Sequence, residues 1–190
     1  MTREMIITEL NNRGYNADSQ NSIKNGVVLE GIESYLYIRG DADKDGYYSA
    51  KISRAILENA NISESEAWEK AEEHTNAETT ITSMAKVMCA MMNMEYWEEM
   101  EDMTPLYVIT NKSKVKGASA ILNKKALAEF GKKHNTDKIV VLPSSVHEML
   151  LVSYTEEIDI DTFSEMVEEV NNAEVDPTER LTDRAYIITL

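Results

Sequence analysis

The stretch Pro105-Leu106-Tyr107-Val108-Ile109-Thr110 decides the fold of the second half of this 190-residue chain. Proline disfavours helix at the residue before it, and the five β-branched, aromatic or aliphatic residues that follow are typical of a buried strand. Similar runs lie at 118–122, 138–142, 149–153 and 185–189, and helical patterns lie at 123–133 and 161–172. This order predicts an α+β domain over residues 104–190, a mixed β-sheet with two helices packed on one of its faces.

The residues before this stretch, 1–103, predict an acidic, mainly helical region with one β-hairpin at 23–39. Asn25-Gly26 is a turn signal, and residues 35–38 read as a strand. Apolar spacing predicts helices at 2–12, 47–59, 63–74 and 78–100, the third beginning at a Ser63–Glu66 capping box. The change near 103 marks either a domain boundary or only a change of subregion within one domain.

The composition is that of a folded, acidic protein. Hydrophobic residues make up 43% of the chain, and 34 acidic against 19 basic residues give a net charge of -15. Cys89 is the only cysteine, so no internal disulfide forms and a reducing compartment fits. The polar N-terminus does not resemble a signal peptide, and no apolar run approaches membrane-spanning length. We therefore expect a cytoplasmic protein with no membrane partner, and no motif calls for a cofactor.

An acidic cluster at 95–102 is the first candidate for a functional surface. Its eight residues hold five carboxylates and two aromatic rings, and the chain as a whole is rich in Met, with 11, and poor in Phe, with 2. On a helix ending at 100, these carboxylates face an unfavourable macrodipole of ~0.3–1 kcal/mol each, which favours a functional role over a solvated helix end. The candidate partner-binding residues are Glu95, Trp97, Glu98, Glu99, Glu101 and Asp102.

A lysine-rich stretch at 112–138 is the second candidate. It could contact phosphates or acidic groups, or it could be the solvated face of a helix. It lacks arginine, and the net negative charge repels phosphates, so direct nucleic-acid binding is not expected except through this stretch. The candidate residues are Lys112, Lys114, Lys116, Lys124, Lys125, Lys132 and Lys133, followed by Lys138.

Asp41, Asp43 and Asp45 match the opening of an EF-hand calcium loop, with Gly46 at its sharp turn. The position that should supply a bidentate glutamate holds Ile52. The pattern therefore predicts a weak calcium site or a solvated acidic turn, and we expect no other metal site.

A hydroxyl, an imidazole and a carboxylate crowd together in Ser144-Ser145-Val146-His147-Glu148. A hydrolase that uses Ser144 or Ser145 with His147 is one hypothesis, although no Gly-x-Ser-x-Gly elbow is present. The other interpretation is a structural turn whose hydroxyls bond nearby backbone groups. In that case we expect His147 to lack an acidic partner on the face of a serine.

Several of these segments together resemble an uncharacterised family. The segments are Leu106 to Lys112, Gly117-Ala118, Ile121-Leu122, Val141 to Glu148, Met166 to Asn171 and Leu181 to Asp183. They are similar to a domain of unknown function found in anaerobic gut bacteria and their mobile elements, over residues 104–185, with a looser likeness around Lys24 to Val27. The resemblance implies a bacterial or phage setting, and it implies no activity.

The preferred functional hypothesis is a non-enzymatic acidic protein that binds another protein through a basic surface on that partner. An inhibitor of a nucleic-acid-acting bacterial defence enzyme, of the anti-CRISPR or anti-restriction type and acting by DNA mimicry, fits the acidity and the missing catalytic motif. The alternatives are the hydrolase with Ser144 or Ser145 and His147, and a weak calcium-binding module at 41–45.

Overall fold

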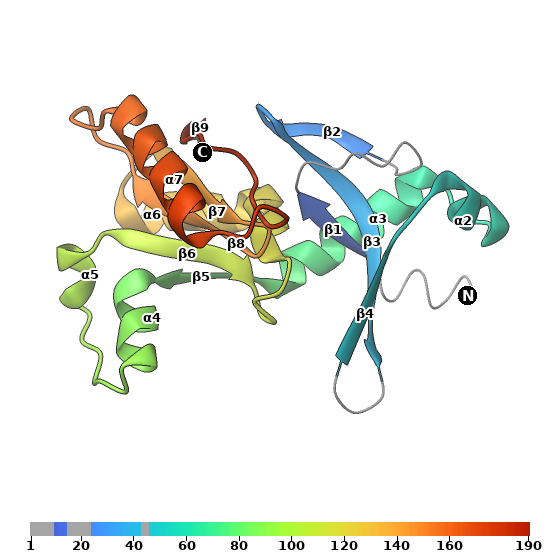
Figure 1. The fold of residues 1–190 in the computed structure, drawn as a ribbon, viewed down its shortest axis with the longest axis horizontal. Coiled ribbons are helices and arrows are strands. Elements are labelled where there is room, and N and C mark those ends of the chain that lie inside the picture. Colours follow the sequence, from blue (N-terminus) through green and yellow to red (C-terminus); the bar gives the residue numbers. More distant parts are fainter. Residues whose placement is uncertain (1–9, 15–23, 43–45) are drawn as a thin grey trace. The chain divides into compact units, whose positions relative to one another are not determined.

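The computed structural model describes residues 10–14, 24–42 and 46–190 (Figure 1). The chain forms two compact units, Met1–Glu78 and Thr79–Leu190. The division lies well before the expected boundary near 103, because the segment after Glu78 opens with a strand that pairs into the sheet of the second unit.

The described part of the first unit contains a small antiparallel sheet and two helices. Its described elements are β1 (Leu10–Gly14), β2 (Lys24–Leu29), β3 (Ile32–Ala42), β4 (Gly46–Lys51), α2 (Arg54–Asn59) and α3 (Glu64–Glu78). The long strand β3 pairs with β1, β2 and β4, so the sheet depends on it.

The predicted hairpin is confirmed, but its turn lies elsewhere. β2 and β3 pair antiparallel around Gly31, whose φ of 84° suits a residue without a side chain. Asn25-Gly26 lies inside β2, where the register shifts between Lys24 and Val27. The predicted capping box is also confirmed, since the Ser63 hydroxyl accepts a hydrogen bond from the Glu66 N–H at 3.2 Å at the start of α3.

The core of the first unit lies between β3 and the helices. Leu36 and Ile38 contribute from the strand, and Ala67 and Ala71, one helical turn apart on α3, pack against the same cluster. The cluster consists of Leu36, Ile38, Ile52, Leu57, Ile62, Ala67 and Ala71, with Ile56, Ala60 and Trp68 at its margin.

Two helix predictions in this unit are wrong in part. Residues 47–51 belong to strand β4, because their backbone pairs with β3, and helix α2 starts only at Arg54, with Ser53 as its cap. The end of the predicted helix 2–12 lies in β1, and its residues 2–9 are outside the described residues. The described part of the first unit is therefore not mainly helical.

The second unit is built on a five-stranded sheet in the order β5-β6-β8-β7-β9. The elements are β5 (Thr79–Ser83), α4 (Met84–Met91), α5 (Met100–Met103), β6 (Leu106–Asn111), the 3₁₀-helix η1 (Gly117–Leu122), α6 (Lys124–His134), β7 (Lys138–Ser145), β8 (Glu148–Ser153), α7 (Ile160–Glu174) and β9 (Tyr186–Thr189). The α+β prediction is confirmed. The four strand pairings of this sheet are all antiparallel.

One face of this sheet carries α6. Residues directly opposite each other on paired strands share a face, so Tyr107, Leu151 and Val141 lie on one face of β6, β8 and β7. The Tyr107 ring meets the Phe130 ring of α6 edge-on at 5.0 Å between centroids. Helix α6 therefore covers this face.

The opposite face carries α7. Leu106, Val152 and Val140 are partners on this face, and Val140 packs against Val167 of α7. The expectation that both helices lie on one face is therefore wrong, since the sheet lies between them (Figure 1). In a sheet that is covered on both faces, the strands are nearly continuous runs of apolar residues. Such runs do not indicate which helix covers which face.

Two further predictions are wrong in this unit. The helix predicted at 78–100 is strand β5, then the short helix α4, then a loop. The strand predicted at 118–122 is the 3₁₀-helix η1, whose small residues Ala118 and Ala120 are buried. A Cβ on Gly117 would lie 2.3 Å from the Thr110 hydroxyl and 2.8 Å from the His147 carbonyl oxygen, so the entry to η1 accepts only glycine.

Truncation tests the position of the division. We expect a fragment of residues 79–190 to unfold cooperatively in urea, because it keeps β5 paired with β6. A fragment of residues 104–190 loses β5 and uncovers the edge of β6, so it should aggregate or unfold at lower urea. Circular dichroism and size-exclusion chromatography measure both, and equal stability of the two fragments would contradict the assignment of β5 to this unit.

Candidate partner-binding surface and adjoining pocket

The segment from α4 to α5 extends from the ends of β5 and β6 (Figure 1). Ser83 starts α4, since its hydroxyl accepts a hydrogen bond from the Lys86 N–H at 3.3 Å. Ala85 and Cys89, four residues apart, are the buried residues of α4, and the Cys89 thiol lies 3.6 Å from the Met100 sulfur of α5. The inner side of the segment is thus attached to the unit, and its outer side is left for other contacts.

Several large apolar side chains of this segment are exposed. Met91 is 81% exposed and Met103 is 85% exposed. The exposed apolar residues of the segment are Met88, Met91, Met92, Met94, Trp97 and Met103, which we call the methionine surface. Six exposed large apolar side chains within sixteen residues of chain are a concentration of the kind that marks sites of interaction where the side chains meet in one patch. Methionine is flexible and polarizable, and it is over-used at binding surfaces that adapt to their partners.

Carboxylates lie among these apolar residues. Glu95, Glu98, Glu99 and Asp102 are exposed, and none of the ion pairs in the described part of the chain involves them. Five of the six residues predicted to bind a partner, these four and Trp97, therefore lie together on one segment with the methionines. The sixth, Glu101, turns inward.

The carboxylates of this cluster do not lie at the C-terminus of a helix, as the sequence had predicted. Glu99 is the residue before α5, and Glu101 and Asp102 lie in its first turn. Carboxylates are favoured at a helix N-terminus, so their position carries no penalty that a function would need to explain. The exposed apolar side chains between them replace that argument.

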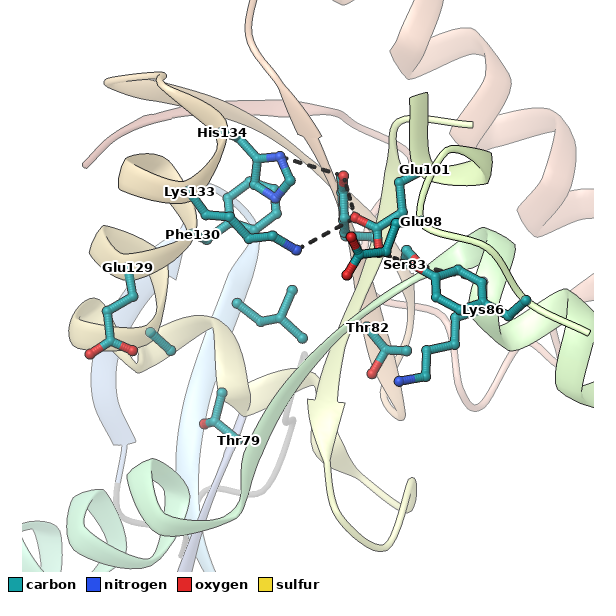
Figure 2. A pocket seen from close by; sticks show the side chains of 14 residues that line it. Thr79, Thr82, Ser83, Lys86, Glu98, Glu101, Glu129, Phe130, Lys133 and His134 are labelled. Carbon is teal, nitrogen blue, oxygen red and sulfur yellow. Dashed lines mark hydrogen bonds and ion pairs between the residues drawn. The ribbon is translucent and has the colours of Figure 1, made fainter. Parts of the chain in front are cut away.

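Glu101 is the centre of a hydrogen-bonded network at the edge of a pocket (Figure 2). Its Oε1 accepts a hydrogen bond from the Tyr96 hydroxyl at 2.5 Å, and its Oε2 accepts one from the Tyr107 hydroxyl at 3.3 Å. Lys133 of α6 approaches Oε2 at 3.5 Å. The Tyr107 hydroxyl also lies 3.4 Å from Nδ1 of His134. The network thus joins α5, β6 and α6.

These contacts set the charges in the pocket. The Tyr96 hydroxyl, with help from Ser83 and Lys133, holds the pKa of Glu101 below its usual value. Burial and the neighbouring Glu101 raise the pKa of Tyr107 to about 12. Burial lowers the pKa of His134. At neutral pH, Glu101 is therefore ionised while Tyr107 and His134 are neutral.

The pocket has a volume of about 530 Å³ and is lined by residues of β5, α4, the loop after α4, α5, β6 and α6. In Figure 2, the α6 side chains Glu129, Phe130 and Lys133 line one side, and Ser83 and Lys86 lie on the other. The exposed Glu98 belongs both to this pocket and to the acidic segment. The pocket and the methionine surface therefore adjoin.

Most of this pocket was not predicted from the sequence. Glu98, Glu101 and Lys133 were candidates, but in separate acidic and basic groups. Nothing in the sequence marked three other residues of the pocket, Lys86, Tyr96 and Tyr107, as functional. In the sequence they resemble any surface lysine or core tyrosine, and only the folded strands and α6 bring them together. The three-residue spacing from Phe130 to Lys133 on a helix was the one available hint that they share a face.

The predicted basic residues do not all lie together. Lys112, Lys114 and Lys116 lie on the 111–117 loop, where Lys114 and Lys116 have positive φ angles of 56° and 53°. Lys124 and Lys125 start α6, and Lys132 and Lys133 end it. Lys132 lines a second hollow with Leu190, Lys133 contacts Glu101, and Lys138 lies over the Tyr154 ring. These lysines therefore lie in several separate places and do not form one basic patch.

His147 connects three segments. Its Nδ1 accepts a hydrogen bond from the Lys116 N–H at 3.1 Å, so the neutral ring carries its proton on Nε2, which lies 3.1 Å from Oε1 of Glu179. Its carbonyl oxygen accepts from the Thr110 hydroxyl at 2.7 Å. Glu179, distant in sequence, is therefore an acidic partner of His147 that the sequence did not reveal.

Ser145, two residues before His147, bonds to the backbone. The Ser145 hydroxyl accepts a hydrogen bond from the His147 N–H at 3.1 Å, as the structural interpretation predicts. Both ring nitrogens of His147 are engaged by groups other than a serine, whereas a serine nucleophile needs a ring nitrogen to take its proton. This geometry favours a structural turn, and the hydrolase with Ser144 or Ser145 stays a prediction.

The calcium candidate lies at a hairpin. Asp41 is in β3, paired with Tyr47 of β4, and residues 43–45 lie outside the described residues. The flanking elements are strands, whereas an EF-hand places its loop between helices. Among the described residues, no three His, Cys, Asp or Glu side chains form a group that could hold a metal ion.

Comparison with known proteins assigns the chain to a family. A family of unknown function, DUF5688, matches residues 2–188, so the chain belongs to this family. The match extends beyond the expected span of 104–185 and includes both units. No curated protein and no solved structure matches the chain. No helix in the described part of the chain has the length and apolar character needed to cross a membrane.

Replacing His147 tests its structural role. His147→Ala removes two ring hydrogen bonds and leaves the Lys116 N–H without its acceptor, so we expect a loss of about 1–3 kcal/mol in the free energy of unfolding. The matched control, Ser144→Ala, should stay within about 0.5 kcal/mol of the parent protein. Urea denaturation measures both, and an unchanged midpoint for His147→Ala would contradict the role given to these bonds.

The network around Glu101 predicts a pH dependence. The pKa of Glu101 is lower in the folded than in the unfolded chain, so its ionised form stabilises the fold above the unfolded pKa of about 4.3. That stabilisation disappears as the pH falls through the folded pKa. Glu101→Gln should therefore lower the free energy of unfolding at about pH 7, and it should lower it much less in strong acid.

Denaturation of the parent and the variant at both pH values gives this difference directly. Glu99→Gln is the control, because Glu99 is exposed and makes no capping bond. It should change stability little at either pH. A cost of Glu101→Gln that is the same in acid and at neutral pH would show that its charge does not matter to the fold.

Proposed function

We propose that this protein is a non-enzymatic binding protein whose methionine surface and surrounding carboxylates receive a basic, amphipathic segment of another protein. One observation carries the proposal. The segment 88–103 exposes five methionines and Trp97 next to four carboxylates that make no ion pair in the described part of the chain.

The apolar part of the surface supplies affinity. Covering a methionine or tryptophan side chain releases water from apolar area at roughly 25 cal/mol per Å². Trp97 is 52% exposed and is the residue type most often found as an anchor at the centre of an interface. The unbranched methionines around it can adopt different rotamers to fit the apolar face of a helix.

The charged part of the surface selects the partner. Glu95, Glu98, Glu99 and Asp102 project from the same segment, on a chain of net charge -15. Such a field attracts basic polypeptides, speeds their encounter and repels acidic ones. A segment with apolar residues on one face and lysines or arginines beside them matches both properties of the surface.

Inhibition of a nucleic-acid-acting bacterial defence enzyme by DNA mimicry is a narrower form of this proposal. It is supported by the acidity and by the basic channel that such enzymes offer. The methionines favour a mixed apolar and ionic contact over mimicry by carboxylates alone. In the narrower form, DNA and this protein compete for one partner, and in the broader form they need not.

A designed peptide tests the proposal without knowledge of the natural partner. The probe is a fluorescent amphipathic helix with leucines on one face and arginines and lysines beside them. Changing Glu95, Glu98, Glu99 and Asp102 together to Lys should weaken its binding at least about tenfold, mainly through the association rate. Binding by the parent protein should weaken as ionic strength rises, and Met91→Ser with Met103→Ser should weaken it through dissociation.

The matched control carries the same change in charge elsewhere. Glu156, Glu157, Glu168 and Glu169 are exposed and lie outside the segment 88–103, so changing these four to Lys should have a much smaller effect. Fluorescence anisotropy and stopped-flow mixing give the affinities and rates. The proposal fails if both sets of four changes weaken binding equally, or if a peptide with glutamates in place of the basic residues binds as well.

A further inference from the structure

The pocket beside the methionine surface already places two ammonium groups of its own chain against binding groups for cations. Nζ of Lys133 lies 3.5 Å from Oε2 of Glu101, and Nζ of Lys86 lies 5.8 Å from the centroid of the Tyr96 ring. A cation over an aromatic face and a cation against a carboxylate are two standard modes of recognition of basic side chains. Both lysines belong to the pocket lining (Figure 2).

We propose that this pocket is the receptor for one arginine side chain of the basic partner, which replaces Lys133 at Glu101. The inference rests on the proposed function, and it adds the residue type that the partner inserts and the place where it goes. The partner's guanidinium lies between the carboxylates of Glu98 and Glu101, and the aromatic side chains beside them cover its planar faces.

The pocket has the size and the charge for this ligand. Its volume of about 530 Å³ is well within the range of pockets that hold small ligands. Three carboxylates, those of Glu98, Glu101 and Glu129, line it against two lysines. Because the pKa of His134 is lowered by burial, its ring adds no positive charge at neutral pH. The pocket without its two lysines is therefore strongly acidic.

Displacing the internal lysine costs little. The Lys133 side chain is 67% exposed, whereas the Glu101 side chain is 20% exposed. Lys133 can turn into water and keep its hydration, while Glu101 stays in place because the Tyr96 and Tyr107 hydroxyls hold it. An arginine brings a planar group with five N–H donors, which an ammonium cannot match at two carboxylates.

The position of the pocket connects this step to partner binding. Glu98 lines the pocket and also belongs to the exposed carboxylates of the segment 88–103, and Tyr96 lies next to Trp97 in the chain. A helix lying on the methionine surface therefore has the pocket within reach of a long side chain. An anionic ligand would instead meet three carboxylates, so the charges favour a cation.

A capped arginine tests the inference directly. The probe is N-acetyl-arginine amide, with N-acetyl-citrulline amide as its uncharged isostere, and binding to the full chain is followed by NMR titration. The arginine probe should shift signals of pocket residues, and the citrulline probe should not. Glu101→Gln should abolish binding, and thermal unfolding checks that this variant is folded. If Glu101→Gln is unfolded, Glu98→Gln takes its place as the variant that removes a carboxylate from the pocket.

Removing the internal competitor gives the sharpest test. Lys133→Ala should tighten binding of the arginine probe about three- to tenfold, because it frees Glu101 and removes a like charge from the pocket. Lys124→Ala is the matched control, because Lys124 is exposed, lies two residues from Ala126 of the pocket lining and so projects from another side of α6. It should leave the affinity unchanged.

The outcomes separate this inference from the proposed function. Weaker binding of the arginine probe by Lys133→Ala, or equal binding of citrulline, overturns the arginine pocket. In the designed helix, changing arginine to citrulline should weaken binding to the parent protein but not to Glu101→Gln. If the helix still depends on the four exposed carboxylates but ignores this change, the surface stands and the pocket inference fails. If the helix does not depend on those carboxylates, the proposed function itself fails.

Discussion

Ser83 is buried at the point where β5 ends and α4 begins, and the candidate site depends on this change of structure. The backbone of Ser83 pairs with Tyr107 on β6, while its hydroxyl accepts the Lys86 N–H at the first turn of α4. Pairing with β6 fixes the edge of the sheet, and the cap turns the chain outward at that edge. Had the helix continued from α3 through this region, the pocket would have lost the wall that β5 provides, and the methionines would have stayed on a straight helix.

The inward position of Glu101 follows from the same arrangement. A partly buried carboxylate is stable only when donors compensate for lost water, and here the donors come from three different parts of the second unit. Tyr96 comes from the loop before α5, Tyr107 from β6 and Lys133 from α6. Its neighbours Glu99 and Asp102 have no comparable donors and remain in water. One residue of the cluster therefore holds the segment in place, and the others are exposed, as the proposed binding of a basic partner requires.

The sequence predicted those elements whose signals are local. The capping box at Ser63 and the buried runs at 138–142 and 149–153 determine a helix and two strands without help from distant residues. Strand β5 was missed because Ile81 continues the three- and four-residue spacing of the α4 methionines, although its three threonines favour a strand. Here pairing with β6 overrode the helical spacing, and spacing alone could not reveal that partner.

The candidate site was predictable only as separate halves. The acidic cluster and Lys133 could be identified from charge alone, and Trp97 was a candidate because it lies within the acidic cluster. The contact between Lys133 and Glu101 could not be predicted, because the two residues are 32 positions apart in the chain. Lys133 reaches Glu101 only when α6 packs on the Tyr107 face of the sheet. The same holds for His147, whose acidic partner Glu179 arrives from beyond α7.

The contact between Lys133 and Glu101 also shows why counting charges along the chain wrongly grouped the lysines into one basic stretch. A charge count along the chain places Lys133 in a basic stretch, but its ammonium lies beside the Glu101 carboxylate, so the two opposite charges offset each other. In the arginine-pocket proposal, Lys133 holds the place at Glu101 that a basic group of the partner takes. A chain with 34 acidic residues has many places to attract a cation. Of the two ion pairs in its described part that join residues far apart in sequence, Lys133–Glu101 is the one that lies in a pocket beside an exposed apolar surface.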